Sequence, residues 1–176
     1  MPRESAKKIL IYGVTGSGKT TFAAKLSERT GIAWHSVDDL TWLPGWIQVP
    51  DEEQEEKIKA ICEGPSWILD TAYAKWHQIP LSRAELIVAL DYPRWLSFRR
   101  LLVRCIKRLF DGKTVCNGNR ESLRNVLSKN SLLLWHIRSW PRKRERVEGW
   151  CRSGLPVKRF RHPRDAERWL QSLMRD

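Results

Sequence analysis

The sequence predicts an α/β protein in which a parallel β-sheet lies between helices on both faces. Strand-like and helix-like segments alternate along the 176-residue chain, and this alternation is typical of parallel sheets covered on both faces. A phosphate-binding loop, Gly13-Val14-Thr15-Gly16-Ser17-Gly18-Lys19-Thr20, stands between the first strand and the first helix, which is the context that such a loop requires. The length is that of one domain spanning residues 1–176.

The N-terminal segments are a strand, a helix and a short second strand. The apolar run 8–12 is typical of a buried strand. A helix at 18–30 is expected to end at Gly31, because glycine readily adopts the left-handed conformation of a C-cap. The second strand, 33–37, leads into a pair of aspartates.

The middle of the chain continues the alternation. An irregular segment at 41–46 precedes a helix at 50–63, whose first turn is acidic, as the helix dipole favours. Apolar strands at 67–69 and 86–90 follow, and an aspartate comes after each of them.

The C-terminal half repeats the pattern with a basic composition. The expected elements are a helix at 94–110, a loop rich in Gly and Asn at 111–120, a helical region from about 121 that is interrupted at Pro141, a strand at 157–160 and a closing helix at 164–174.

The phosphate-binding loop predicts a nucleotide site. Glycines allow successive N–H groups to curl around a phosphate, and the following helix adds its positive N-terminal end. Lys19 is expected to reach the β- and γ-phosphates of ATP, and the Thr20 hydroxyl to bind Mg²⁺. The predicted nucleotide-binding residues are Gly13, Thr15, Gly16, Ser17, Gly18, Lys19, Thr20 and Thr21.

Three aspartates follow predicted strands and are expected to meet at one cleft, because ligands of such sheets bind beyond the carboxyl ends of the strands. Asp70 suits Mg²⁺, and Asp91 is a rival with the same pattern, although a turn explains Asp91 equally well. Glutamate follows neither residue, and no N-K-x-D motif occurs. These absences favour a phosphotransferase over a mechanochemical ATPase or a GTPase. Asp38 is the candidate that faces the acceptor and takes its proton, with a helix cap as the alternative.

Arginines in the basic half are candidates for stabilising the transferred phosphoryl group. Arg100, Arg104 and Arg108 recur every four residues and therefore share one helix face. With Arg120 after the following loop, they are predicted to close over the phosphates, and Lys19, Asp38, Arg100, Arg104 and Arg120 form the predicted catalytic set. Further candidates are Arg138, Arg142 and Arg144, and surface positions explain most of the arginines equally well.

The chain contains ten tryptophans. Trp42, Trp46 and Trp76 lie near the expected acceptor site, where an aromatic face can stack on a base, although ordinary packing also explains each one. The tryptophans assigned to packing are Trp95, Trp135, Trp140, Trp150 and Trp169.

Charge is distributed unevenly. Residues 1–93 carry 10 Lys and Arg against 13 Asp and Glu, whereas residues 94–176 carry 22 against 7. A basic half of this kind seeks polyanions such as nucleotide phosphates or nucleic acid, and a solvated helical surface is the plainer explanation. The four cysteines have neither metal-ligand spacing nor a C-x-x-C pair, so we expect free thiols in the cytoplasm. No apolar run is long enough to cross a membrane.

The chain resembles the P-loop nucleotide kinases, and more closely the adenylate-kinase-like proteins of DNA topology modulation, the FlaR-related family. Besides the phosphate loop, the resemblance rests on segments 37–46, 67–70, 90–96 and 140–144. It implies a three-layer α/β/α fold with five parallel strands, an acceptor-binding segment at about 38–65 and a helical lid at about 111–125, with Mg-ATP as donor. Where the family has Asp-Gly-Asn-Tyr, this chain has Asp70-Thr71-Ala72-Tyr73.

Two functional hypotheses follow. The first is an enzyme that transfers the γ-phosphoryl group of ATP to a nucleoside monophosphate or a related metabolite. The second is a nucleotide-dependent regulator whose basic half contacts DNA. This hypothesis is less favoured because the sequence contains no known DNA-binding motif. The sequence indicates neither the acceptor nor the oligomeric state.

Overall fold

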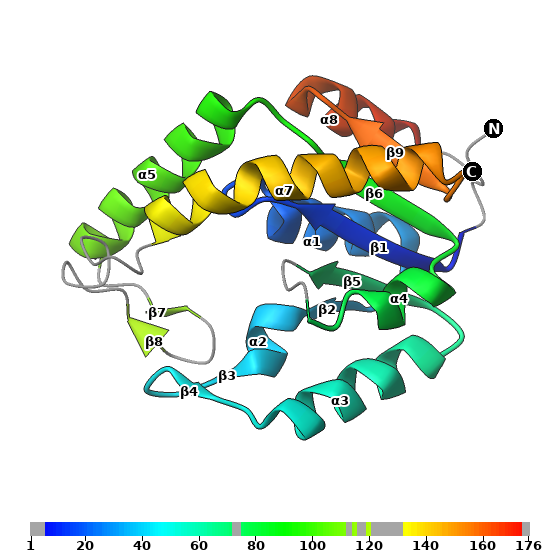
Figure 1. The fold of residues 1–176 in the computed structure, drawn as a ribbon, viewed down its shortest axis with the longest axis horizontal. Helices are drawn as coiled ribbons and strands as arrows, with labels where there is room; N and C mark the ends of the chain where they lie inside the picture. The colour runs from blue at the N-terminus through cyan, green and yellow to red at the C-terminus, as the bar shows by residue number, and fades with distance from the viewer. Residues whose placement is uncertain (1–5, 72–74, 112–113, 116–118, 121–131, 174–176) are drawn as a thin grey trace.

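The computed structural model confirms the predicted architecture, a parallel five-stranded sheet between two layers of helices (Figure 1). The residues that it describes are 6–71, 75–111, 114–115, 119–120 and 132–173. The strands of the sheet are β1 (Lys8–Gly13), β2 (Trp34–Ser36), β5 (Trp67–Thr71), β6 (Leu86–Leu90) and β9 (Val157–Phe160).

The strand order in the sheet is β2-β5-β1-β6-β9. β1 is central, and it pairs in parallel with β5 on one side and with β6 on the other. The chain therefore leaves β1 in one direction to build β2 and β5, and later returns to the other side to build β6 and β9. A reversal of this kind opens a crevice at the carboxyl ends of the central strands, where ligands bind in open α/β sheets.

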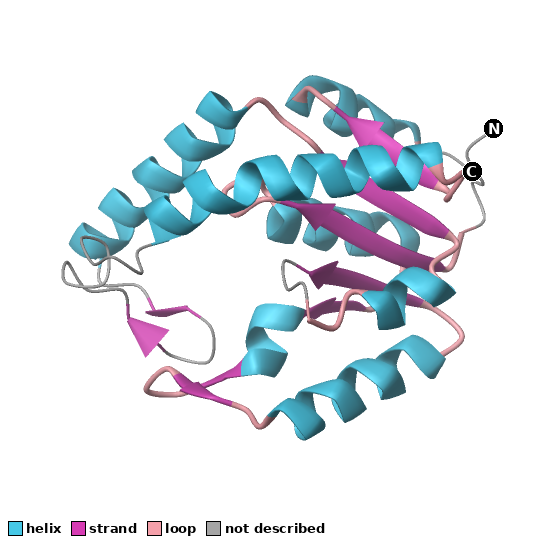
Figure 2. Cartoon of the chain, viewed as in Figure 1, coloured by secondary structure: helices cyan, strands magenta, loops and turns pink. Residues whose placement is uncertain are grey.

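The helices cover both faces of the sheet (Figure 2). They are α1 (Lys19–Thr30), α2 (Val37–Thr41), α3 (Asp51–Glu63), α4 (Gln78–Arg83), α5 (Arg94–Asp111), α7 (Leu132–Arg152) and α8 (Pro163–Ser172). α1 ends as predicted: Gly31 has φ 69°, and its N–H donates to the carbonyl of Ser27.

Alternation along β1 divides the core into two layers. Ile9 and Ile11 pack with side chains of α1 and α8 on one face, among them Phe22 and Leu170. On the other face, the neighbouring side chains of β1 pack with residues of α3 and α7, such as Ile58. A strand buried on both faces must be apolar throughout, which explains the unbroken apolar run after Lys8.

The structure differs from the sequence prediction in the connections. The segment predicted to be irregular at 41–46 contributes to a hairpin of β3 (Trp42–Leu43) and β4 (Ile47–Gln48). Its turn places Gly45 at φ 81° and Trp46 at φ 59°. α4 was not predicted, and the expected loop at 111–120 contains β7 (Thr114–Val115) and β8 (Asn119–Arg120).

Two further expectations concern the basic half. The interruption predicted at Pro141 is wrong, because α7 continues through this residue. Much of the expected lid at 111–125, and the helix start at about 121, lie outside the described residues. Across the part of the chain that is described, no helix combines the length and apolar character needed to cross a bilayer.

Candidate active site

A cavity of about 1170 Å³ lies beyond the carboxyl ends of β1 and β5. Two groups of elements contribute to its lining: the phosphate-binding loop with α5 and α7, called the loop end below, and α2 with the β3–β4 hairpin, called the hairpin end. Most residues predicted for the site line it: Thr15, Gly16, Ser17, Gly18, Lys19, Thr20, Thr21, Asp38, Asp70, Arg100 and Arg104. Gly13 is absent from this lining and lies at the end of β1.

Glycines in the loop are required both by backbone conformation and by space. Gly16 and Gly18 have φ of 83° and 90°, which other residues rarely adopt. A Cβ atom on Gly16 would come within 2.4 Å of the Ser97 carbonyl oxygen of α5, and one on Gly13 within 2.9 Å of the Leu90 carbonyl oxygen. The loop is therefore held tightly between β1, β6 and α5.

The loop presents polar groups that suit a phosphate. No side chain caps the N-terminus of α1, so its first N–H groups are available to an anion. The Ser17 hydroxyl oxygen is buried and has no hydrogen-bond partner among the described residues. Lys19 is only 8% exposed, and its ammonium group donates to the carbonyl of Val14 at 3.1 Å.

Thr20 and Asp70 meet beside this lysine. The Thr20 hydroxyl donates to the Asp70 carboxylate at 2.8 Å. Burial raises the pKa of Asp70, whereas the charge of Lys19 and the Thr20 hydrogen bond oppose the rise. A hydroxyl oxygen and a carboxylate oxygen side by side are the ligands that Mg²⁺ takes in nucleotide sites. The residues present therefore fit a nucleotide-bound magnesium ion.

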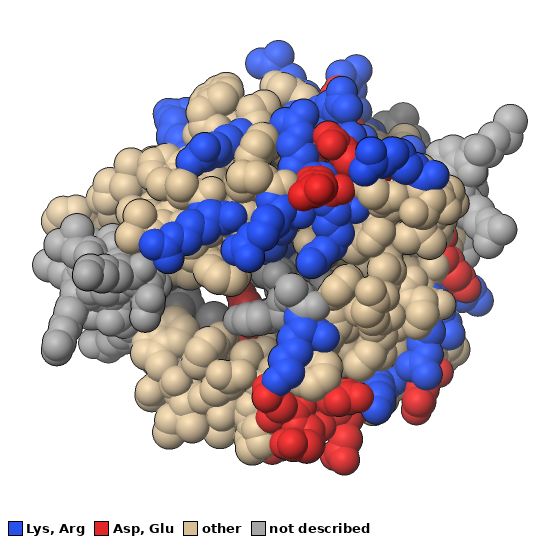
Figure 3. Space-filling view, viewed as in Figure 1, with Lys and Arg blue, Asp and Glu red and all other residues tan. Residues whose placement is uncertain are grey.

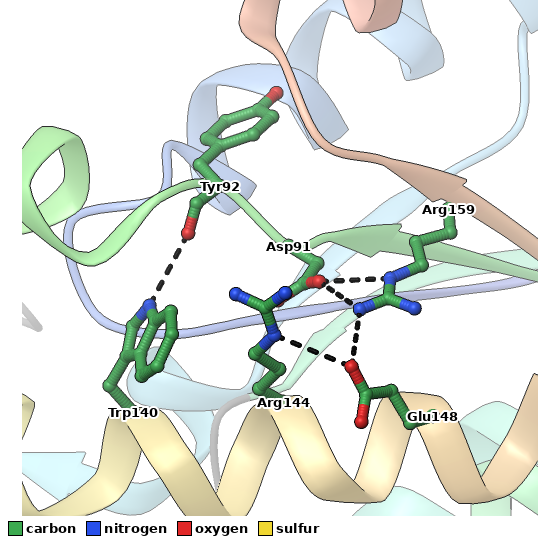
Figure 4. Close-up of polar contacts among 6 residues, drawn as sticks. All are labelled: Asp91, Tyr92, Trp140, Arg144, Glu148 and Arg159. Carbon is green, nitrogen blue, oxygen red and sulfur yellow. Dashed lines mark hydrogen bonds and ion pairs between the residues drawn. The ribbon is translucent and has the colours of Figure 1, made fainter.

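Asp91, the predicted rival, is engaged elsewhere (Figure 4). Its carboxylate accepts hydrogen bonds from Nε and Nη2 of Arg159, at 2.9 and 2.5 Å. Arg159 also contacts Glu148, which in turn contacts Arg144. Asp91 does not line the cavity. Of the three aspartates expected to meet there, only Asp38 and Asp70 are lining residues.

Cations from two helices face the loop. Arg100 of α5 donates to the Ser17 carbonyl at 3.5 Å and lies over the ring of Tyr92. Arg104 and Arg108 follow it along the cavity wall, and Arg142 joins them from α7. Arg138 and Arg144 are not among the lining residues, and the side chain of Arg120, in β8, lies outside the described part.

Lys143 of α7 is a site residue that sequence reasoning missed. It is 7% exposed, and its ammonium group donates to the carbonyl of Gly13 at 3.3 Å. The pKa of Lys143 is lowered to about 7, first by burial and then by the charges of Lys19 and Arg146, against the opposing effect of Asp38 and Asp70. Two lysines thus flank the start of the phosphate loop.

A signal for Lys143 was present in the helical spacing of α7. The buried positions of α7 are His136, Ser139, Lys143, Val147 and Trp150, which recur every three or four residues. A lysine in such a stripe points to the interior. Its position within the basic Arg-Lys-Arg run of α7 concealed it among surface charges.

The hairpin end of the cavity is acidic and aromatic. Asp38 and Asp39 lie in the first turn of α2 and line the cavity. Trp42 and Trp46 line it from the hairpin, with ring centroids 5.8 Å apart and planes at 77°. Trp76 is not a lining residue and instead donates to the Gln54 side chain at 3.4 Å.

Two of the tryptophans that the sequence assigned to packing are exposed. Trp135 is 50% exposed and lines the cavity, and Trp95 is 66% exposed on the outer surface. The assignment was wrong for both, because each lies on the exposed side of a helix. Trp150 and Trp169 do pack, Trp150 edge-on against Tyr12 and Trp169 stacked on Phe22.

Cys62, Cys105 and Cys151 form no disulfide with one another, and Cys116 lies outside the described residues. Within the same residues, no three His, Cys, Asp or Glu side chains come together to hold a metal ion.

The solved structures with a similar fold include shikimate kinases and a gluconokinase. Shikimate kinase from Acinetobacter baumannii, in complex with shikimate, has a TM-score of 0.58 and 17% identity over 97% of this chain and 92% of its own. Shikimate kinase from Bacteroides thetaiotaomicron has a TM-score of 0.55 and 12% identity over 96% and 97%. A gluconokinase from Sinorhizobium meliloti 1021 has a TM-score of 0.50 and 16% identity over 95% of this chain and 93% of its own.

At these identities the similarity establishes the fold, which is the three-layer fold of the P-loop kinases. No protein-family model matches the sequence, and no curated protein matches it either. Membership of the FlaR-related family therefore stays a prediction.

Proposed function

We propose that the protein transfers the γ-phosphoryl group of Mg-ATP to a small acceptor. The observation that carries this proposal is the contact of Thr20 with Asp70 beside the buried Lys19, at the end of a glycine loop with two positive φ angles. This group of residues combines a phosphate cradle, a cation and oxygen ligands for a metal in one place.

Each part of the donor end has a role in the proposed reaction. The loop N–H groups and Lys19 hold the phosphates, and Lys143 and Arg100 place positive charge where the migrating group becomes more negative. Thr20 and Asp70 would hold the magnesium ion, which supplies charge neutralisation between the phosphates. Arg104, and Arg120 beyond the described side chains, complete the proposed set of cations.

Asp38 lines the cavity from α2, near enough for its charge to act on the pKa of Lys143 and Asp70, and it is the proposed proton acceptor. General-base assistance of this kind requires a carboxylate within reach of the acceptor. Nucleoside monophosphates and related metabolites are the acceptors that the sequence favours. We also propose a cytoplasmic location, which the sequence predicts from the spacing of its cysteines.

The test is ADP release from Mg-ATP in the presence of single candidate acceptors: nucleosides, their monophosphates and common hydroxylated metabolites. We expect release above the rate of ATP hydrolysis with at least one acceptor, and a phosphorylated product by mass spectrometry. The proposal fails if no acceptor increases release and Mg-ATP does not bind.

A second candidate, DNA binding, is favoured by one observation. Lys and Arg side chains gather over α7 on the face drawn in Figure 3, and residues 94–176 carry an excess of 15 positive charges. Contacts with DNA phosphates weaken steeply with salt because they release counterions. A gel-shift titration with duplex DNA at 50 and 200 mM salt tests this candidate, and an absence of binding at the lower salt removes it.

A further inference from the structure

The two ends of the cavity differ in charge: cations outnumber the carboxylate of Asp70 at the loop end, and two carboxylates precede the hairpin. At the loop end, the cationic side chains of α5 and α7 join Lys19. At the hairpin end, the charged lining residues closest in the sequence to Trp42 and Trp46 are Asp38 and Asp39. This division bears on the acceptor, since a charged ligand is selected by the sign of the charges around it.

The segment around the hairpin end is acidic as a whole. Residues 38–65 contain eight Asp and Glu against two Lys, and Figure 3 shows acidic side chains gathered over the first part of α3. Both lysines are neutralised nearby: Lys57 pairs with Glu53 and Lys59 with Glu55, each at 2.6 Å. These exposed pairs leave little positive potential for a phosphate.

Positive charge is scarce in the neighbouring sequence as well. No arginine occurs between Arg29 and Arg83. Lys75 does line the cavity, but it forms an ion pair with Asp51 and lies over the ring of Trp76 at 5.0 Å. Bidentate recognition of a phosphate or carboxylate depends on arginine. The described residues of this end offer no such group.

Tryptophan rings and carboxylates together suit a different kind of ligand. Trp42 and Trp46 present aromatic surface at right angles to each other, which suits the apolar face of a sugar ring or a base. Asp38 and Asp39 can accept hydrogen bonds from hydroxyl groups, and they attract an amino group.

We propose that the acceptor is a hydroxylated ring compound without phosphate or carboxylate, such as a nucleoside, a neutral sugar or an amino sugar. This inference rests on the proposed phosphoryl transfer to a small acceptor, and it replaces the nucleoside monophosphates that the sequence favours with acceptors that carry no phosphate. A bond forms between the acceptor hydroxyl oxygen and the γ-phosphorus, while the bond from that phosphorus to the β–γ bridging oxygen breaks. ADP leaves with the electron pair of that bond, and the hydroxyl proton passes to Asp38.

The experiment compares related acceptors that carry different charges. Glucosamine, glucose, gluconate and glucose 6-phosphate form one series, and adenosine and AMP form a second. Each is tested for ADP release with Mg-ATP. We expect a neutral or aminated member of at least one series to stimulate release at least tenfold more than its anionic counterparts.

A pair of variants tests whether the hairpin end sets this preference. Asp39→Asn removes a negative charge from the cavity lining, so the ratio of neutral to anionic turnover should fall about fivefold. Glu56→Gln makes the same charge change on the exposed side of α3, outside the lining, and should leave the ratio unchanged.

Stimulation by anionic acceptors alone, or by no neutral or aminated compound, overturns the inference. Equal effects of the two variants overturn it too. The proposed function fails separately, by loss of Mg-ATP binding in calorimetry, so a protein that binds ATP and phosphorylates only AMP contradicts the acceptor class and leaves the phosphotransfer proposal standing.

Discussion

The two ends of the cavity are built in different ways. At the loop end, backbone and side chains are locked: Gly16 lies against α5, Lys19 and Asp70 are buried, and the central strands pack on both faces. At the hairpin end, a two-residue ladder carries exposed side chains, and Ile47 is 61% exposed. A rigid loop end suits the phosphates of ATP, which are the same for every acceptor. Substitutions at the lightly packed hairpin end should cost less stability.

The largest effect should follow from removing the ammonium group at the donor end. Lys19→Ala takes away charge that the phosphates need, so we expect ATP consumption to fall by about 10³-fold. Lys59→Ala, on the exposed side of α3, is the matched control and should keep wild-type turnover. The fold of both variants is checked by circular dichroism. Wild-type-like turnover in a folded Lys19→Ala protein would count decisively against the donor site.

Replacing each of the two strand-end aspartates by asparagine should distinguish the proposed metal ligand from a structural ion pair. Asp70→Asn should lower activity about 10- to 100-fold and raise the magnesium requirement, because a ligand of the metal is lost. Asp91→Asn should leave the kinetics near wild type and cost about 2 kcal/mol of stability, since it breaks the partly buried pair with Arg159. Magnesium titrations and thermal unfolding measure the two effects, and the reverse pattern would restore Asp91 as the metal ligand.

The donor end was largely predictable, because its residues are local in sequence. The loop, its flanking strand and helix, and the cap at Gly31 depend on neighbours within a few positions. The choice between Asp70 and Asp91 was not predictable, since both follow apolar strands. The partner of Asp91 is Arg159, which comes 68 residues later and is brought close by the parallel pairing of β6 with β9.

The β3–β4 hairpin and α4 could not be predicted from the sequence, for physical reasons. The β3–β4 hairpin depends on positive φ at Gly45 and Trp46, and no Asn-Gly or Asp-Gly turn announces it. α4 has six residues, too few to show a helical period. Lys143 was missed because its burial arises from the packing of α7 over the start of the loop, although its helical spacing carried the information.

A smaller effect, on the KM for the acceptor, should distinguish the hairpin end from the loop end. Trp46→Ala removes ring surface from the hairpin, so the KM for the acceptor should rise about tenfold. The affinity for Mg-ATP should stay unchanged. Trp95→Ala, on the outer surface of α5, removes the same side chain outside the cavity and should alter neither value. A loss of ATP affinity in Trp46→Ala would show that the two ends are not separate.

The smallest effect is a pH dependence at the donor end. Burial holds the pKa of Lys143 at about 7, and a bound triphosphate should raise it. ATP binding then takes up a proton above pH 7, and affinity should fall as pH rises, by at most about tenfold per pH unit. Calorimetry in buffers of different ionisation enthalpy measures the uptake.

Two variants of Lys143 check the assignment. Lys143→Met should abolish the proton uptake and weaken ATP binding, whereas Lys143→Arg should keep the affinity with a flatter pH profile, because arginine stays protonated. An unchanged uptake in Lys143→Met would assign the proton to another group.

The most direct test of the account is calorimetric titration of the folded protein with Mg-ATP, beside Lys19→Ala. We expect one ATP bound per chain in the wild type and strongly weakened binding in the variant. Wild-type protein that binds neither ATP nor GTP in the presence of magnesium would contradict the proposed donor site.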